Sequence, residues 1–350
     1  MVISLNNKIC LKSLNLKELE NFFIGLNQPK YKAKQVFEWL SKGVLSFYEM
    51  TNISKELQEK LDEISYINTL KIEKKLVSKI DGTVKYLFKL MDGEFIESVI
   101  MEYKHGTSIC ISTQVGCKMG CKFCASTIKG FKRNLTSAEI LDQIIFSAID
   151  LGKRITNVVL MGIGEPLDNY DNLLNFLEIV NNRNGLNISH RRICVSTCGI
   201  VDKIFMLAEK QLQITLSVSI HAPNDMLRNK VLPINLKWGV DELINSCHYY
   251  ISKTGRRISF EYILIDGVND KEENALELAK ILKGMLCHIN LISVNKVDER
   301  EFLKSNIKTT NNFLAILKEK GLNATVRRVL GSDINASCGQ LRIDSINIAN

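Results

Sequence analysis

Three cysteines stand close together in the run Cys117-Lys-Met-Gly-Cys121-Lys-Phe-Cys124. Thiolates are soft ligands that suit zinc or iron–sulfur clusters. A structural zinc site needs four protein ligands and usually adds a second close doublet of Cys or His, but the next such residue after Cys124 is His190. In a 4Fe–4S cluster, three thiolates leave one iron open to a small molecule. The spacing therefore favours an iron–sulfur cluster over structural zinc and over incidental thiols.

A fourth cysteine, Cys338, lies between Ser and Gly in the polar run 331–341, which is not a typical core position. An exposed cysteine acts as a nucleophile when its surroundings lower its pKa. Taken alone, an incidental thiol is the simpler interpretation, and the cysteine run upstream makes a nucleophile the better one. The residue types alone place Cys110 in the core and Glu97, within a predicted strand, facing solvent.

The run Gly162-Ile-Gly164-Glu165-Pro166 directly follows a predicted strand. Its glycines let the main chain approach a ligand closely, and its Glu can accept hydrogen bonds from an ammonium group. A dinucleotide fingerprint would need a third glycine where Leu167 stands, and a plain tight turn is the simplest alternative. The ends of later predicted strands carry Ser196, Ser219, Ile220, His221 and Asn295. We expect these strand ends to meet at one ligand-binding edge.

These residues need a scaffold, which the periodicity of the chain predicts. Residues 1–71 are expected to form a helical accessory domain, because apolar residues recur there at helical spacing. Residues 1–90 contain lysines but no arginine, which suits a surface that faces nucleic-acid phosphate or an ordinary solvated surface. Over residues 72–107 the period changes to two between Asp-Gly turn signals, which predicts an antiparallel β extension.

From residue 108 to residue 350, predicted strands alternate with predicted helices. The strands after the cysteine run are expected at residues 157–161, 192–196, 214–220, 258–263 and 288–294. Together with the strand that leads into the cysteine run, they make six strand–helix units, fewer than a full eightfold barrel contains. Such units predict an α/β domain with parallel strands and crossover helices.

Composition narrows the class of protein. The chain has 350 residues with a net charge of +8 and ten cysteines, which favours a polyanionic partner and a reducing, cytoplasmic location. We expect no signal peptide, because the amino-terminal residues lack a long apolar run after a positively charged start. No uncharged apolar stretch is long enough to predict a membrane span.

The cysteine spacing resembles the signature of radical S-adenosylmethionine (SAM) enzymes, and the six units resemble their partial (β/α)6 barrel. Six runs make the resemblance more specific: CKMGCKFCASTIKGFKRNL, MGIGEPLDN, VSTCGI, SIHAPND, RRISFEYILIDGVND and SDINASCGQLR. In this order they resemble the bacterial family that methylates carbon 2 of an adenosine in 23S rRNA and of an adenosine beside the anticodon in some tRNAs. The likeness covers nearly the whole chain.

The resemblance implies roles for individual residues. Cys117, Cys121 and Cys124 would bind the 4Fe–4S cluster. SAM would contact Gly164, Glu165, Ser196, Ser219, Ile220, His221 and Asn295. Cys338 would carry the methyl group, Glu97 would accept a proton and Cys110 would be the second catalytic thiol, so that a Cys110–Cys338 disulfide forms during turnover. This sequence departs from the family pattern at Ile220, where Leu is usual, and at Asn335 and Ser337, where the family has Asp and Ala.

The resemblance also implies partners. These are 23S rRNA, tRNA and an electron donor such as flavodoxin with its reductase. The enzyme itself is expected to be a monomer. Two alternatives stay open. One is the sister family that methylates carbon 8 of the same rRNA adenosine, against which MGIGEP and CASTIKG argue. The other is a non-catalytic iron–sulfur or zinc RNA-binding protein.

Overall fold

Parallel strands form the centre of the fold in the computed structural model, which describes residues 8–104 and 106–341. Within these residues, one ten-stranded sheet has the order β14-β13-β12-β11-β10-β9-β6-β5-β4-β3. Its parallel strands are β6 (Gly106–Cys110), β9 (Asn157–Leu160), β10 (Ile193–Thr197), β11 (Thr215–Ser219), β12 (Ile258–Leu264), β13 (Cys287–Ser293) and β14 (Ala324–Val326). The six expected units are confirmed, and the further strand that the sequence predicts at residues 324–329 is present as the short parallel strand β14.

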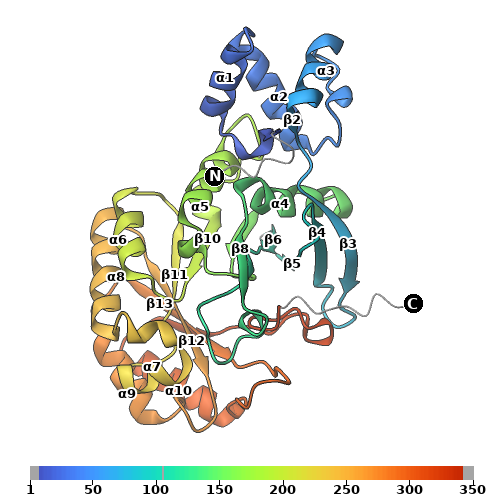
Figure 1. The fold of residues 1–350 in the computed structure, drawn as a ribbon. Helices are drawn as coiled ribbons and strands as arrows, with labels where there is room; N and C mark the ends of the chain where they lie inside the picture. Colours follow the sequence, from blue (N-terminus) through green and yellow to red (C-terminus); the bar gives the residue numbers. More distant parts are fainter. Residues whose placement is uncertain (1–7, 105, 342–350) are drawn as a thin grey trace.

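Helices cover the outside of this curved sheet (Figure 1). They are α4 (Ser137–Leu151), α5 (Tyr170–Asn181), α6 (Val201–Glu209), α7 (Asp225–Val231), α8 (Val240–Thr254), α9 (Glu272–Ile281) and α10 (Ile307–Glu319). The strands between helices and barrel interior are rich in buried Val, Ile and Leu, as strands covered on both faces require. The connections include 3-10 turns at Pro166–Asn169, His190–Arg192, Pro233–Leu236 and Ser332–Ile334.

The β extension continues the barrel sheet rather than forming a separate layer. Its strands are β3 (Leu70–Val77), β4 (Val84–Leu90) and β5 (Phe95–Tyr103), and β5 pairs antiparallel with β6. One face packs on α4, where the Ser98 hydroxyl donates to Gln143 Oε1 at 2.7 Å. The opposite face carries Glu97, Val99 and Cys110, because side chains alternate across a strand.

The amino-terminal helices form a lobe above the barrel in Figure 1. They are α1 (Leu16–Gly25), α2 (Lys30–Lys42) and α3 (Lys55–Ile64), and β1 (Ile9–Cys10) pairs with β2 (Ser65–Tyr66) beside them. Short 3-10 turns lie at Leu11–Ser13 and Phe47–Glu49. The fully buried Lys12 Nζ lies 2.8 Å from Asp142 Oδ1 of α4, and the Thr69 hydroxyl donates to the other oxygen at 2.6 Å. These bonds attach the lobe to the barrel.

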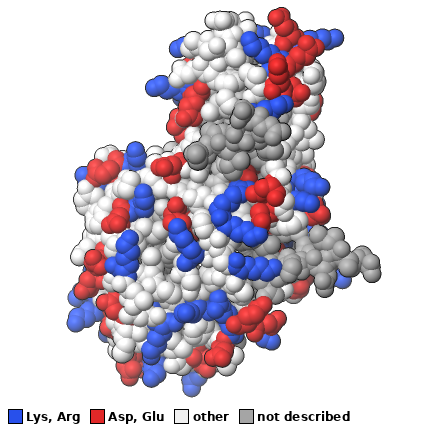
Figure 2. All heavy atoms as spheres, in the orientation of Figure 1, with Lys and Arg blue, Asp and Glu red and all other residues white. Residues whose placement is uncertain are grey.

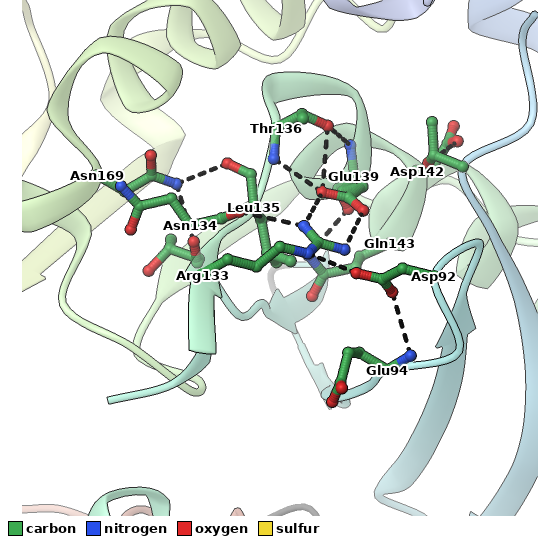
Figure 3. Close-up of polar contacts among 12 residues, drawn as sticks. Asp92, Glu94, Arg133, Asn134, Leu135, Thr136, Glu139, Asp142, Gln143 and Asn169 are labelled. Atoms are coloured by element: carbon green, nitrogen blue, oxygen red, sulfur yellow. Dashed lines mark hydrogen bonds and ion pairs between the residues drawn. The ribbon is translucent and has the colours of Figure 1, made fainter. Parts of the chain in front are cut away.

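The cysteine run lies in a loop between β7 (Gln114–Gly116) and β8 (Phe131–Asn134), beside a 3-10 turn at Ala125–Thr127. Arg133 of β8 fixes this hairpin to its surroundings (Figure 3). Its Nε lies 2.6 Å from Asp92 Oδ2, and its Nη2 lies 2.8 Å from Glu139 Oε1. Glu139 also forms a capping box with Thr136 at the start of α4. The base of the cysteine loop is therefore tied to both α4 and the β extension.

Charged side chains of both signs are interspersed on the face shown in Figure 2, over the amino-terminal lobe as well as the barrel. This distribution does not single out the amino-terminal lysines as one continuous basic patch on that face. In the described part of the chain, no helix combines the length and the apolar character needed to cross a membrane.

Candidate active site

A cavity of about 150 Å³ opens where the barrel strands end. It is lined by nine residues that the sequence predicted for the site: Cys117, Cys121, Cys124, Gly164, Glu165, Ser196, Ser219, His221 and Cys338. These residues come from stretches far apart in the sequence, and the parallel sheet brings them together because the carboxyl ends of its strands meet at one edge. Glu97, Cys110, Ile220 and Asn295 are not among the lining residues.

The three clustered cysteines line one part of this cavity. Their loop is held by main-chain bonds from Cys117 N to Gly130 O at 3.1 Å and from Lys122 N to Val231 O at 2.9 Å. Burial raises the pKa of the Cys117 thiol to about 12 and also raises the pKa values of Cys121 and Cys124. A metal must therefore displace protons from these thiols when it binds.

Within residues 8–104 and 106–341, no three His, Cys, Asp or Glu side chains gather closely enough to hold one metal ion. A cubane cluster takes each thiolate on a different iron, so its cysteines stand wider apart than the ligands of a single ion. Three cysteine thiols on the wall of one cavity suit a cluster with one open iron.

Glu165 joins the ends of two neighbouring strands. Its Oε2 accepts from Cys198 N at 2.8 Å, just beyond β10, and its Oε1 accepts from Leu167 N at 3.0 Å. Burial raises the pKa of this carboxyl group, although these main-chain donors lower it in part. Gly164 has a φ of +107°, and a Cβ there would lie 2.6 Å from the Gln114 side chain. Only glycine fits this position without a shift of its neighbours.

His221 is held as a neutral imidazole. Burial, and then the charge of Arg228, lower its pKa to about 3. Its Nδ1 accepts a hydrogen bond from Ile263 N at 3.1 Å, so the ring proton lies on Nε2. The Phe123 ring of the cysteine loop meets the imidazole edge to face, with ring centroids 5.0 Å apart. His221 therefore supports the cysteine loop and offers one N–H donor.

Glu97 is buried, with 7% of its surface exposed, so the expectation from residue type that it faces solvent is wrong. The physical reason is that a distant part of the chain covers this face of β5. Ala336 and Leu341, from the segment that follows β14, pack with Val99 and Cys110 in one buried apolar cluster. Cys110 is buried, as its residue type predicts. Burial, and then the nearby Cys338, raise its pKa to about 12.

Residues 331–341, the C-terminal segment, are anchored to the β3–β4 turn. Asp81 Oδ2 accepts from Gly331 N at 2.9 Å, while Asp333 accepts from Ser78 Oγ at 2.7 Å and from Lys79 N at 2.9 Å. Beyond these anchors, Gly339 O accepts from Ala125 N of the cysteine loop at 2.8 Å. Cys338 is thereby held between the β extension and the cysteine loop. All ten cysteines, including Cys110 and Cys338, are free thiols in this structure.

Two residues predicted to contact SAM have protein partners instead. The Asn295 side-chain amide donates to Cys338 O at 2.9 Å. The Ile220 side chain is completely buried in the core. Its N–H donates to Glu261 O at 3.1 Å, and its carbonyl accepts from Ala222 N at 2.7 Å and from Arg228 Nε at 3.0 Å.

Sequence analysis missed two charged residues that line the cavity, Glu261 and Arg327. Glu261 Oε1 accepts from Ser217 Oγ at 2.8 Å and from Asn290 Nδ2 at 2.9 Å. Its Oε2 is buried without a hydrogen-bond partner among the described residues, 3.8 Å from Arg327 Nη1. The nearby Cys338 and Glu261 raise the pKa of Arg327, although burial opposes this. The only sequence signal for either residue was the place of Glu261 within the predicted strand 258–263.

Comparison with known proteins identifies the family of this chain. Residues 111–279 match the radical SAM superfamily, and residues 9–67 match the N-terminal domain of ribosomal RNA large subunit methyltransferases. The chain is 56% identical to "Probable dual-specificity RNA methyltransferase RlmN" of Alkaliphilus oremlandii, over 96% of this chain and 98% of that protein. It is 55% identical to the protein of the same name from Clostridium tetani, over 96% of each chain.

A crystal structure of a radical SAM methyltransferase from Sphaerobacter thermophilus has the same fold. It superimposes with a TM-score of 0.91 at 42% identity and covers 95% of this chain and 98% of its own. The radical SAM match means that the enzyme uses a 4Fe–4S cluster and SAM. With relatives this similar over nearly the whole length, the chain belongs to the RlmN family of dual-specificity RNA methyltransferases.

Proposed function

We propose that the enzyme methylates carbon 2 of an adenosine in 23S rRNA and of an adenosine beside the anticodon in some tRNAs. The observation that carries this proposal is the meeting of Cys110 with the segment that holds Cys338. Cys338 lies near enough to raise the pKa of Cys110, which shares a face of β5 and β6 with the buried carboxylate of Glu97. Carbon 2 of adenine has no acidic proton and is electron-poor, so a simple polar methyl transfer from SAM has no nucleophile to use.

In this proposal Cys117, Cys121 and Cys124 hold the cluster. Gly164, Glu165, Ser196, Ser219 and His221 hold SAM, with the Ile220 carbonyl and Asn295 beside them. A carboxylate has about four lone-pair sites, so Glu165 can accept from the SAM ammonium group as well as from its two main-chain donors. When bound, the cluster and SAM supply a carbon-centred radical that removes a hydrogen atom from a methyl group.

The protein residues act before and after that event. The Cys338 thiolate takes a methyl group from one SAM molecule, which leaves as S-adenosylhomocysteine. After the Cys338 S-methylene carbon has bonded to carbon 2, Glu97 accepts the carbon-2 proton, and the one electron lost with that proton would pass to the cluster. The Cys110 thiolate then attacks the sulfur of Cys338 and joins the two cysteines in a disulfide. The methylene carbon keeps the electron pair of the broken S–C bond and takes up a proton, so that methylated RNA is released. An electron donor such as flavodoxin with its reductase would supply electrons. We expect the enzyme to act as a monomer in the cytoplasm.

The test is mass spectrometry of rRNA and tRNA treated with the wild-type enzyme under anaerobic reducing conditions. We expect 2-methyladenosine in both RNAs, and Cys338→Ala should abolish it. Cys287→Ala is the matched control, because Cys287 is a buried thiol at the start of β13, at the other end of the barrel strands. A methyl group on carbon 8 would contradict the proposal and favour the sister activity. Bound zinc without SAM cleavage would favour a binding protein.

A further inference from the structure

Lys85 of β4 lies on the same face of the sheet as Glu97 and Cys110, the two proposed catalytic residues of its strands. It stands opposite Val99 in the β4–β5 register, while its neighbour on that face, Leu87, stands opposite Glu97. Val99 in turn stands opposite Cys110 of β6. Lys85 is therefore a diagonal neighbour of Glu97, within reach of a long side chain.

The ammonium group of Lys85 bonds to two partners. It lies 3.1 Å from Glu97 Oε1 and donates to the carbonyl oxygen of Asn335 at 3.3 Å. The side chains of Lys85 and Glu97 are only 11% and 9% exposed. Water and salt screen such a pair much less than a surface pair. Hydrogen bonds with a charged partner are also the stronger kind.

The bond to Asn335 O holds the C-terminal segment at a point farther along the chain than its anchors to Asp81 and through Asp333. Asp81 and Asp333 fix the start of the segment, near residues 331–333. Lys85 bonds at Asn335, where the chain has a left-handed φ of +50° and turns toward Cys338. One cation thus connects the carboxylate of Glu97 with the stretch of main chain that leads to Cys338.

We propose that Lys85 is a positioning residue for the methyl transfer. It sets the distance between the Glu97 carboxylate and the Cys338 sulfur by bonding to that carboxylate and to the main chain at Asn335. This inference rests on the proposed roles of Glu97 and Cys338. Lys85 itself touches neither RNA nor cofactor in this account.

The test compares Lys85→Met with Lys85→Arg and with the control Lys89→Met. Lys89 lies four residues along the same strand on the same face, and its ammonium group lies over the Phe95 ring, 5.7 Å from the centroid. In the cofactor-free protein, hydrogen exchange at the Ala336 amide should rise about tenfold in Lys85→Met, since a charged hydrogen bond that holds the segment is lost. It should stay at the wild-type rate in Lys89→Met, and Lys85→Arg should restore most of the protection.

With cofactors and RNA, Lys85→Met should still methylate Cys338, because Asn295 and the cysteine loop continue to hold residues 338–339. Release of methylated RNA should fall about tenfold, and protein joined covalently to RNA through Cys338 should accumulate on a denaturing gel. Wild-type exchange and wild-type product release in Lys85→Met would overturn the proposal. If the wild-type enzyme leaves carbon 2 unmodified, the proposed function fails, while the exchange comparison still decides whether Lys85 holds the segment.

Discussion

Arg228 Nη2 donates to the main-chain carbonyl of Cys198 at 2.6 Å and so links α7 to the end of β10. The same guanidinium donates to Ser219 O at 3.1 Å and to Ile220 O at 3.0 Å, at the end of β11. The side chain is completely buried. One arginine therefore fixes the ends of two neighbouring strands on which the proposed SAM contacts lie.

Replacement of Arg228 by Met should destabilise the fold and weaken SAM binding together. Several buried carbonyls would lose their donor, and each unpaired group costs about 1–3 kcal/mol. Urea unfolding and calorimetric titration with SAM measure the two effects. Arg256→Met is the control, since that half-buried arginine donates to Ile214 O at the start of β11, away from the cavity. Equal losses in the two variants would show that Arg228 has no special role at the strand ends.

Gly331→Ala should displace the C-terminal segment. At this position φ is +62°, and a Cβ would lie 2.7 Å from Ala336 Cβ and 2.9 Å from Thr83 Cγ2. Such overlap adds about 1–3 kcal/mol to the cost of a left-handed φ, and it moves Cys338 with the segment. We expect less S-methylation of Cys338, measured by peptide mass spectrometry.

Gly321→Ala separates the cost of steric overlap from the cost of a left-handed φ. Gly321 has a φ of +81°, and a Cβ at this position would meet no atom of the described residues within 4 Å. Its Ala variant should lose only about 1–2 kcal/mol of unfolding free energy and keep normal S-methylation. If Gly331→Ala behaves in the same way, close packing at residue 331 does not position Cys338.

Acid should release the C-terminal segment only at a pH below the ordinary pKa of an aspartate side chain. The Ser78 hydroxyl, and then Lys79 N–H, lower the pKa of Asp333. Burial would raise the pKa of Asp81, but hydrogen bonds from Gly331 N–H and Thr83 outweigh it, so this pKa is also lowered. The anchoring that such carboxylates provide is present above their unfolded pKa of about 3.9 and is lost as the pH falls through the lower folded values.

Hydrogen exchange at Gly331 and Ala336, corrected for the intrinsic pH dependence, measures this release. Protection should be constant from about pH 7 to pH 5 and should fall below about pH 3.9. The double variant Asp81→Asn, Asp333→Asn should show weak protection throughout and no such step. A loss of protection near pH 6 in the wild-type protein would point to other titrating groups.

Cys110→Ala should stop the reaction at its last proposed step. Methylation of Cys338 and bond formation to adenine need no second thiol, whereas release of the product does. The variant should cleave SAM with RNA present, yet it should release little methylated RNA and accumulate a covalent protein–RNA band on a denaturing gel. Cys247→Ala, which removes another fully buried thiol, serves as the control. Normal turnover by Cys110→Ala would show that another group releases the product.

The sequence predicts the cysteine loop well because the spacing of Cys117, Cys121 and Cys124 is local information. The strand-end residues could also be predicted, because a parallel sheet places successive strand ends at one edge. The burial of Glu97 could not be predicted in the same way. It depends on a segment more than two hundred residues later in the chain, which only the folded structure brings onto β5. Arg228, Glu261 and Arg327 were missed for the same reason, since a charged residue's partner decides its role and those partners are distant in sequence.

The order of strands in the large sheet shows a second role of the C-terminal segment. The segment leaves the sheet after β14, which is one edge strand, and bonds to the turn that precedes β4, next to the other edge strand, β3. The C-terminal segment therefore connects the two edges of the open sheet. Because Cys338 lies within this segment, the position of the proposed methyl-carrying thiol depends on both edges of the sheet at once.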